Sequence, residues 1–284
     1  MRAFDPEVAD AVWAAFEPLI PEPHDTHPYG GHRQRLCDRW CFDVIVVRLA
    51  TGASWKDSAL LAGAKVSDWT VRARRDEWIA AGIIADLECE SLDAFDTTIG
   101  LDLSEVGVDG SLHKAPCGGE GTGPNPTDRA KSGWKWSIAV DTNGIVLGVA
   151  IDGANRNDGV MLEPTLADMD RYGLIADIDT IHLDAGYDSA RVNDLLDSLG
   201  IDGAVIAHRR RPGEPKPDRR PGLGLRWVVE RTNSWLSNFG QLRRNNDRHS
   251  RHRRAHLGLA LIFLITAKLI DWRNRYTPGT APTP

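Results

Sequence analysis

Three acidic residues lie in segments that can bring their side chains together. Asp109 occurs in EVGVDGS and Asp184 in TIHLDAGYDS, each after an apolar run typical of a β-strand, whereas Glu230 occurs in LRWVVERTNSWL, which has helical spacing. If the two strands are neighbours, the aspartates converge, because ligands of α/β sheets gather at strand ends. Carboxylate oxygens are ligands that Mg²⁺ accepts, so the sequence predicts a metal site.

Two Mg²⁺ or Mn²⁺ ions about 3.5–4 Å apart can activate an attacking oxygen and stabilise a leaving one in phosphoryl transfer. Each residue also has a plainer interpretation. Aspartate followed by a turn is a common turn residue, and Arg226 lies four residues before Glu230, which suits a simple ion pair worth about 0.2–0.5 kcal/mol. The three acids together favour the hypothesis of a two-metal site.

Charge is segregated along the chain. The net charge of −6 combines balances of −7 over residues 1–100, −11 over 101–207 and +12 over 208–284. A basic block of this size in an acidic protein indicates a polyanion partner, and we expect the phosphate backbone of double-stranded DNA. The alternative is an arginine-rich surface that only contacts water.

Basic side chains near the acids, in the basic block and on an N-terminal helix are candidates for DNA contacts. Trp235 is added because an aromatic ring can stack on a base, although helical spacing also fits a core position. The loop arginine and lysines can equally be solvated. The predicted DNA-binding residues are Arg72, Arg74, Arg75, Arg129, Lys131, Lys135, Arg226, Arg231, Trp235, Arg243, Arg244, Arg251, Arg253 and Arg254.

The first predicted domain, over residues 1–98, is all-α. Ser54 and Ser67 precede two short helical segments as N-caps, and Gly82 ends the second segment. Two short helices joined by a tight turn, with arginines on the second, fit a helix-turn-helix. Many small helical domains share this pattern without binding DNA.

The second predicted domain, over residues 103–275, is α/β. A strand at about 105–108 ends at Asp109, two strands joined by a TNG hairpin turn follow, and helix, strand, helix and strand come next. A Pro- and Arg-rich linker over 208–222 leads to the helix that carries Glu230. This order predicts a mixed sheet flanked by helices. Residues 276–284 are expected to form a flexible tail.

The composition, 42% hydrophobic and 26% charged, is ordinary for a soluble protein. The N-terminal residues show no leader pattern, and the apolar run over 255–270 is shorter than the roughly 20 residues of a membrane span, which indicates a buried helix. The four cysteines lack a paired CxxC pattern. We therefore expect reduced thiols, a cytoplasmic, nucleoid-associated location and no membrane partner.

Longer motifs carry a family resemblance. They are VDGS, NPTDRAKSGWKWSIAVDTNG, IDGANRNDGVMLEP, HLDAGYDS and RWVVERTNSWL, with WAAFEPLIP and DRWCFDVIVVRLATGASWKD nearer the N-terminus. In these motifs, which extend over nearly the whole chain, the sequence resembles the DDE transposases of bacterial insertion sequences, most closely the insertion-sequence-five group. The resemblance implies an RNase H-like core with Asp109, Asp184 and Glu230 as the metal-binding catalytic triad.

The resemblance also implies an activity. Such enzymes bind the terminal inverted repeats of their element, work as a dimer on DNA, cut at the element ends and join the 3′-hydroxyl to target DNA. Two other functions stay open: a metal-dependent nuclease that cuts without joining, and an inactive, transposase-derived regulator that only binds DNA.

One family signature is incomplete in this chain. It runs Tyr, two residues, Arg, three residues, Glu, six residues, Lys, and this chain keeps Arg226 and Glu230. Leu223 stands in place of the Tyr and Ser237 in place of the Lys. Arg243 or Arg244 is the candidate replacement for the missing phosphate contact.

Overall fold

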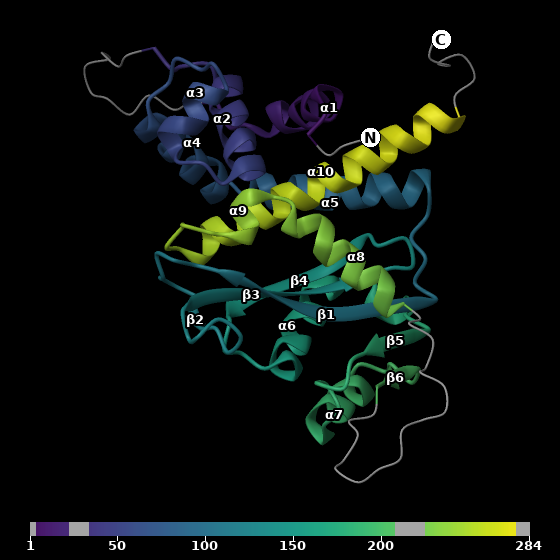
Figure 1. The fold of residues 1–284 in the computed structure, drawn as a ribbon. Coiled ribbons are helices and arrows are strands. Elements are labelled where there is room, and N and C mark those ends of the chain that lie inside the picture. The colour runs from purple at the N-terminus through teal and green to yellow at the C-terminus, as the bar shows by residue number, and fades with distance from the viewer. Residues whose placement is uncertain (1–3, 23–33, 208–224, 277–284) are drawn as a thin grey trace, which may run out of the picture. The chain divides into compact units, whose positions relative to one another are not determined.

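The computed structural model describes residues 4–22, 34–207 and 225–276 and contains two compact units. The helical unit comprises Met1–Thr98, Phe239–Leu242 and Arg251–Pro284, and the sheet unit comprises Ile99–Asn238 and Arg243–Ser250. Figure 1 shows the elements of both units. The predicted linker over 208–222 and the predicted tail beyond Tyr276 lie outside the described residues.

Helices build the first unit, and two of them begin where the sequence indicates. The side chains of Ser54 and Ser67 accept hydrogen bonds from the backbone N–H groups of Asp57 and Thr70, so both predicted N-caps are confirmed. The helices are α1 (Pro6–Phe16), η1 (Glu17–Leu19), α2 (Asp38–Thr51), α3 (Trp55–Leu61), α4 (Asp68–Ala80), α5 (Ile83–Thr98), the short α9 (Gly240–Arg243) and α10 (Ser250–Tyr276).

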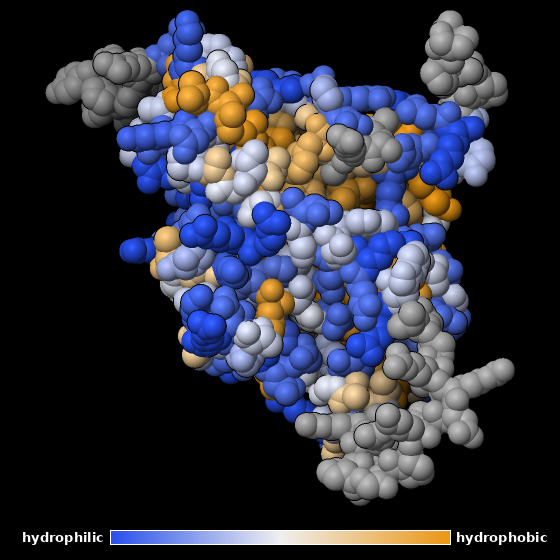
Figure 2. Space-filling view, in the orientation of Figure 1, coloured by the Kyte–Doolittle hydropathy of each residue, from blue (hydrophilic) through white to orange (hydrophobic). Residues whose placement is uncertain are grey.

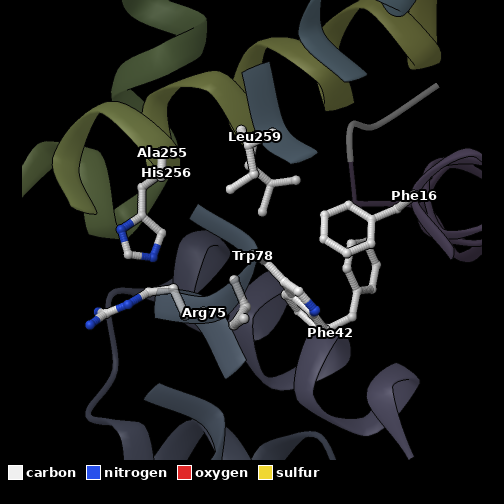
Figure 3. Close-up of a pocket in the computed structure, with 9 residues that line it drawn as sticks. Phe16, Phe42, Arg75, Trp78, Ala255, His256 and Leu259 are labelled. Atoms are coloured by element: carbon white, nitrogen blue, oxygen red, sulfur yellow. The ribbon is translucent and has the colours of Figure 1, made fainter. Parts of the chain in front are cut away.

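Aromatic side chains form the core of the helical unit. The ring of Phe16 lies 4.9 Å from that of Trp78 and 5.3 Å from that of Phe42, measured between centroids. Together with Leu259 of α10 they line a small apolar pocket (Figure 3). α10 is therefore a core helix of this unit, as the predicted buried helix requires.

α10 marks a difference from the predicted domains. The sequence groups residues up to 275 with the sheet, whereas the part of α10 from Arg251 onward belongs to the helical unit because it packs on α1, α2 and α4. Among the described residues, α10 is the helix long and apolar enough to cross a membrane by length and composition. However, 67% of its most apolar window is buried inside the protein.

The sheet unit has the predicted α/β architecture. Its strands are β1 (Glu105–Lys114), β2 (Gly123–Pro124), β3 (Ser132–Val140), β4 (Val146–Gly153), β5 (Thr180–Leu183) and β6 (Ala204–Ile206). Its helices are α6 (Asp158–Asp170), η2 (Ile175–Asp177), α7 (Ala190–Ser198) and α8 (Arg226–Ser237). The strand order is β2-β3-β1-β5-β6, with β4 also on β3. β3 pairs antiparallel with β1, β2 and β4, whereas β5 pairs parallel with β1 and with β6. The mixed sheet flanked by helices is confirmed.

α6 and α8 cover opposite faces of this sheet (Figure 1). The ring nitrogen of Trp136 reaches Asn233 of α8, and the hydroxyl of the next residue, Ser137, accepts a hydrogen bond from Thr165 of α6. Successive residues of a strand point to opposite faces, so β3 is buried on both sides.

The first strand is longer than predicted. The sequence ends it at Val108, whereas β1 continues to Lys114 because β3 pairs with it as far as Gly133. Asp109 therefore lies within a strand, opposite Ile138, and not at its end. The prediction was wrong on this point because the pairing partner lies more than 20 residues away in the sequence.

Candidate functional site

Asp109 and Asp184 come together through the pairing of β1 with β5. The two strands are parallel, with Gly107 opposite His182. Two residues further along, Asp109 of β1 is level with Asp184, the first residue beyond the end of β5. The charge of Asp184 reaches Asp109, so the structure brings together the two predicted aspartates.

Asp109 is in an unfavourable place for a charge. Burial raises the pKa of its carboxyl from 3.8 to about 6, and the negative charges of Asp184 and Asp158 act in the same direction. A hydrogen bond from the backbone N–H of Gly110 and the positive charge of Arg226 oppose this rise. A bound cation would relieve the repulsion between the two aspartates.

A tight turn holds Asp184. Its side chain accepts a hydrogen bond of 2.7 Å from the backbone N–H of Gly186, and its carbonyl accepts one of 3.1 Å from the N–H of Tyr187. The side chain of Tyr187 is fully buried, and burial raises the pKa of its hydroxyl well above the usual value. The DAGY segment therefore has a structural task as a turn, as its sequence also allows.

Glu230 lies on α8, the helix that packs on β1 and β3. Its carboxylate pairs with the guanidinium of Arg226 at 3.0 Å, and both side chains are about half exposed. Asn233, one turn further on, donates a hydrogen bond of 3.3 Å to Asp109. Residues 226, 230 and 233 share one face of the helix, so Glu230 lies between two residues that act on Asp109.

The third acid is nevertheless directed at an arginine. Within residues 4–22, 34–207 and 225–276, no group of three His, Cys, Asp or Glu side chains is arranged to hold a metal ion. The structure thus brings Asp109 and Asp184 together and places Glu230 on the adjoining helix, with its carboxylate in an ion pair. The plain ion pair that the sequence suggests for Glu230 is present.

Comparisons with known proteins identify the family of the chain. The family described as "Transposase DDE domain" matches residues 101–266, more than half of the chain. The chain belongs to this family. A second family, described as "Putative transposase of IS4/5 family", matches residues 8–87 in the helical unit.

Two curated relatives of this DDE-family chain come from Burkholderia cepacia. A "Putative transposase for insertion sequence element IS402" is 39% identical over 43% of this chain and 57% of its own length. An "Insertion element IS402 uncharacterized 16.2 kDa protein" is 31% identical over 43% of this chain and 82% of its own length. The chain therefore spans little more than half of the first relative.

Two solved structures of a transposase show weak similarity. The Mos1 transposase paired-end complex with left transposon end covers 86% of this chain and 82% of its own, at 12% identity and a TM-score of 0.26. The Mos1 mariner paired-end complex with Mn covers 91% and 86%, at 12% identity and a TM-score of 0.27. At scores this low, the superposition assigns no residue of this chain to a counterpart.

Lys135 of the DDE-family core differs from its prediction as a DNA contact. Its side chain is only 6% exposed, and its ammonium pairs with Asp158 and donates to the carbonyl of Arg156 at 3.4 Å. Its side chain lies on the face covered by α6 and against Gly110, so in this structure its ammonium is occupied by Asp158 of that helix. The role of Asp158 was missed because it depends on β3 and α6 meeting in space.

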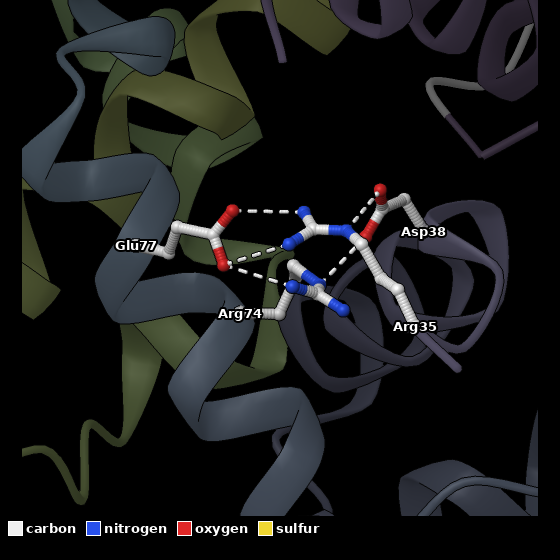
Figure 4. A network of polar contacts seen from close by, with 4 residues as sticks. All are labelled: Arg35, Asp38, Arg74 and Glu77. Carbon is white, nitrogen blue, oxygen red and sulfur yellow. Dashed lines mark hydrogen bonds and ion pairs between the residues drawn. The ribbon is translucent and has the colours of Figure 1, made fainter. Parts of the chain in front are cut away.

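Arginines of the helical unit also differ from their predictions. Arg74 pairs with Asp38 at 2.6 Å and with Glu77 at 2.8 Å, and Arg35 completes this network (Figure 4). The buried side chains serve the fold because an unpaired buried charge is costly. Three other predicted DNA contacts of the helical unit are buried or partly buried: Arg75, which pairs with Asp76, Arg253, and Arg254, which pairs with Glu88.

Arg72 is the exposed arginine on α4, where it pairs with Asp68 at 2.8 Å. α3 and α4 also carry exposed apolar side chains: Leu60 and Leu61 of α3 are 80% and 64% exposed, and Trp69 of α4 is 71% exposed. Figure 2 shows hydrophobic side chains gathered in the region of α3 and α4. The exposed surface of the predicted helix-turn-helix is therefore more apolar than its sequence suggests.

The remaining predicted contacts are exposed or partly exposed. Arg231 stacks between two tryptophans, with its guanidinium carbon 4.5 Å from the ring centroid of Trp227 and 4.7 Å from that of Trp235. Trp235 is thus partly exposed on α8 and is not a core residue. The exposed basic residues are Arg129, Lys131, Arg226, Arg243, Arg244 and Arg251.

Proposed function

We propose that this chain is an insertion-sequence transposase that cuts DNA at the ends of its element and joins the 3′-hydroxyl ends to target DNA. The observation that carries the proposal is the alignment of Asp109 with Asp184 across β1 and β5, beside the helix that bears Glu230. Family membership supports the proposal, because DDE transposases generally use divalent metal ions.

The donor chemistry of these residues fits Mg²⁺ or Mn²⁺. Asp109 and Asp184 supply carboxylate oxygens whose mutual repulsion a cation would relieve. The guanidinium of Arg226 on α8 lowers the pKa of Asp109 and pairs with Glu230. Its positive charge therefore already compensates part of the negative charge of these acids. We infer that two metal ions are held by Asp109, Asp184 and Glu230, with Glu230 released from Arg226. Such ions activate the attacking oxygen and stabilise the leaving one in phosphoryl transfer.

The protein's own residues have the tasks of binding and orienting DNA. Exposed basic groups of the sheet unit, such as Arg129, Lys131 and Arg243, are proposed to hold the backbone phosphates. Trp235, whose ring is stacked on Arg231, is proposed to contact a base. Arg72 is the contact that we propose for the helical unit.

The proposed partner is double-stranded DNA, namely the terminal inverted repeats of the element and a target site. Two element ends have to be held together for joining, so we propose a homodimer in the DNA complex. This activity requires access to DNA inside the cell.

The test is strand cleavage and joining by the Asp109→Asn variant. Labelled element ends, a plasmid target and Mg²⁺ are incubated with the wild-type chain, the variant and a matched control, Asp152→Asn. Asp152 is an acid of the same sheet that pairs with Arg156. We expect the control to cut and join, and Asp109→Asn to do neither while it still binds DNA. Joining by Asp109→Asn would refute the mechanism.

Two other outcomes identify the alternatives. Cleavage without joined products by the wild-type chain would identify a metal-dependent nuclease. DNA binding with neither reaction, and no heat of Mg²⁺ binding at millimolar metal, would identify a DNA-binding regulator.

A further inference from the structure

Asn233 links the α8 helix to Asp109. Its side-chain amide nitrogen donates a hydrogen bond of 3.3 Å to Oδ2 of Asp109, and its amide oxygen accepts one of 2.8 Å from Nε1 of Trp136. Asn233 is 7% exposed and Trp136 is fully buried. The contact to Asp109 is therefore part of a chain of hydrogen bonds that runs from the buried Trp136 of β3 through α8 to the partly exposed Asp109 of β1.

The tryptophan determines which end of the amide faces Asp109. An indole N–H is only a donor, so the atom of Asn233 that faces it is the oxygen. The NH₂ group must then face the carboxylate. The Trp136 ring is itself held, because it stacks on the buried ring of His113 with 3.5 Å between centroids and packs edge-on against Trp134.

We propose that Asn233 is a positioning residue that holds the carboxylate of Asp109 for the metal ion. The inference rests on the proposed function, because it assigns Asp109 as a metal ligand. A carboxylate that ligates a metal is commonly held by a hydrogen bond from a neighbouring residue, and removal of that neighbour typically weakens metal binding about 10–100-fold. Asn233 has no side-chain contact with Arg226 or Glu230 among the interactions described for α8.

Thr232 provides a matched control on the same helix. It is fully buried, and its hydroxyl donates a hydrogen bond of 3.1 Å to the carbonyl of Gly144. Thr232→Val removes one buried hydrogen bond of α8 without a contact to Asp109. If lower stability alone weakens metal binding, the Thr232 and Asn233 variants both show the effect. If the lost positioning of the Asp109 carboxylate is the cause, only the Asn233 variants show it.

The experiment measures Mn²⁺ binding to the full chain by electron paramagnetic resonance, with no DNA present. Asn233→Ala removes the amide, and Asn233→Leu removes it while keeping a similar volume, so that one variant remains if the other does not fold. Urea unfolding of each variant is measured in parallel. We expect both Asn233 variants to bind Mn²⁺ about 10–100-fold more weakly and Thr232→Val to match the wild type within about twofold.

The outcomes separate the two levels of inference. Wild-type affinity in both Asn233 variants, or an equal loss in Thr232→Val, would overturn the positioning role and leave the proposed function standing. A wild-type chain that binds Mn²⁺ no better than Asp109→Asn would overturn the metal site and the positioning role together.

Discussion

Replacing Asp109 with asparagine should stabilise the metal-free protein at neutral pH. Burial raises the pKa of Asp109 from 3.8 to about 6, so the folded protein holds this proton more strongly than the unfolded chain does. Stability from this group is fully present below pH 4 and falls as the pH rises through about 6. Asparagine has no charge to bury, and its oxygen still accepts the hydrogen bond from Asn233.

The size of the effect follows from the shift in pKa. At 1.36 kcal/mol for each pKa unit, a rise from 3.8 to about 6 corresponds to roughly 3 kcal/mol at pH 8. This value is an upper bound, because the side chain is partly exposed and water screens its charge. We expect a gain of about 1–3 kcal/mol at pH 8 and almost none at pH 4.

The assay is urea unfolding in the presence of EDTA at both pH values. Asp102→Asn is the control with the opposite sign. Hydrogen bonds from Ser104 and Thr142 lower the pKa of Asp102, so its charge stabilises the fold above pH 4 and that stabilisation is lost as the pH falls. No gain in the free energy of unfolding of Asp109→Asn at pH 8, or an equal gain at pH 4, would refute the reasoning.

Three further predictions concern basic residues that the sequence analysis lists as DNA contacts. Lys135→Met leaves Asp158 without its partner and should cost about 2 kcal/mol in urea unfolding, because one charge of a partly buried pair stays behind. Adding Asp158→Asn should restore most of this loss, and no recovery would argue against the pair. Arg74→Ala should cost about 1–3 kcal/mol, because it removes one of the two arginines that pair with Asp38 and Glu77 in Figure 4 and leaves these acids with Arg35 alone. Arg72→Ala should keep its stability within about 0.5 kcal/mol and lower the salt slope of DNA binding by about one, and an unchanged slope would remove Arg72 from the proposed interface.

Local patterns were enough to predict most elements of the fold. The N-caps at Ser54 and Ser67 and the TNG turn between β3 and β4 depend on neighbouring residues, and the structure has them where the sequence indicates. The extent of β1 was not predictable in this way, because β3 determines it from the other side of a long loop. The grouping of α10 with the helical unit likewise depends on which apolar faces meet.

The candidate site shows the same division between local and distant information. The sequence shows three acids and many arginines, but not which acid each arginine meets. Arg74 and Arg75 resemble surface residues of a recognition helix in the sequence and are buried in the fold. Asn233 has no distinctive signal beyond its position seven residues after Arg226, which places both on one face of α8.

Arg226 connects the electrostatics of the metal-free protein with the proposed reaction. Its charge lowers the pKa of Asp109 and its guanidinium binds Glu230, so it partly compensates the negative charge of the site. A metal ion held by the three acids would add positive charge beside this arginine, which weakens the hold of Arg226 on Glu230. On the proposed function, the released guanidinium is then free for a DNA phosphate, for which its planar donors are well suited. In the free protein Arg226 and Glu230 pair with each other. Metal binding would engage Glu230 and DNA binding would engage Arg226, so each event would release the residue that the other needs, and the two would favour each other.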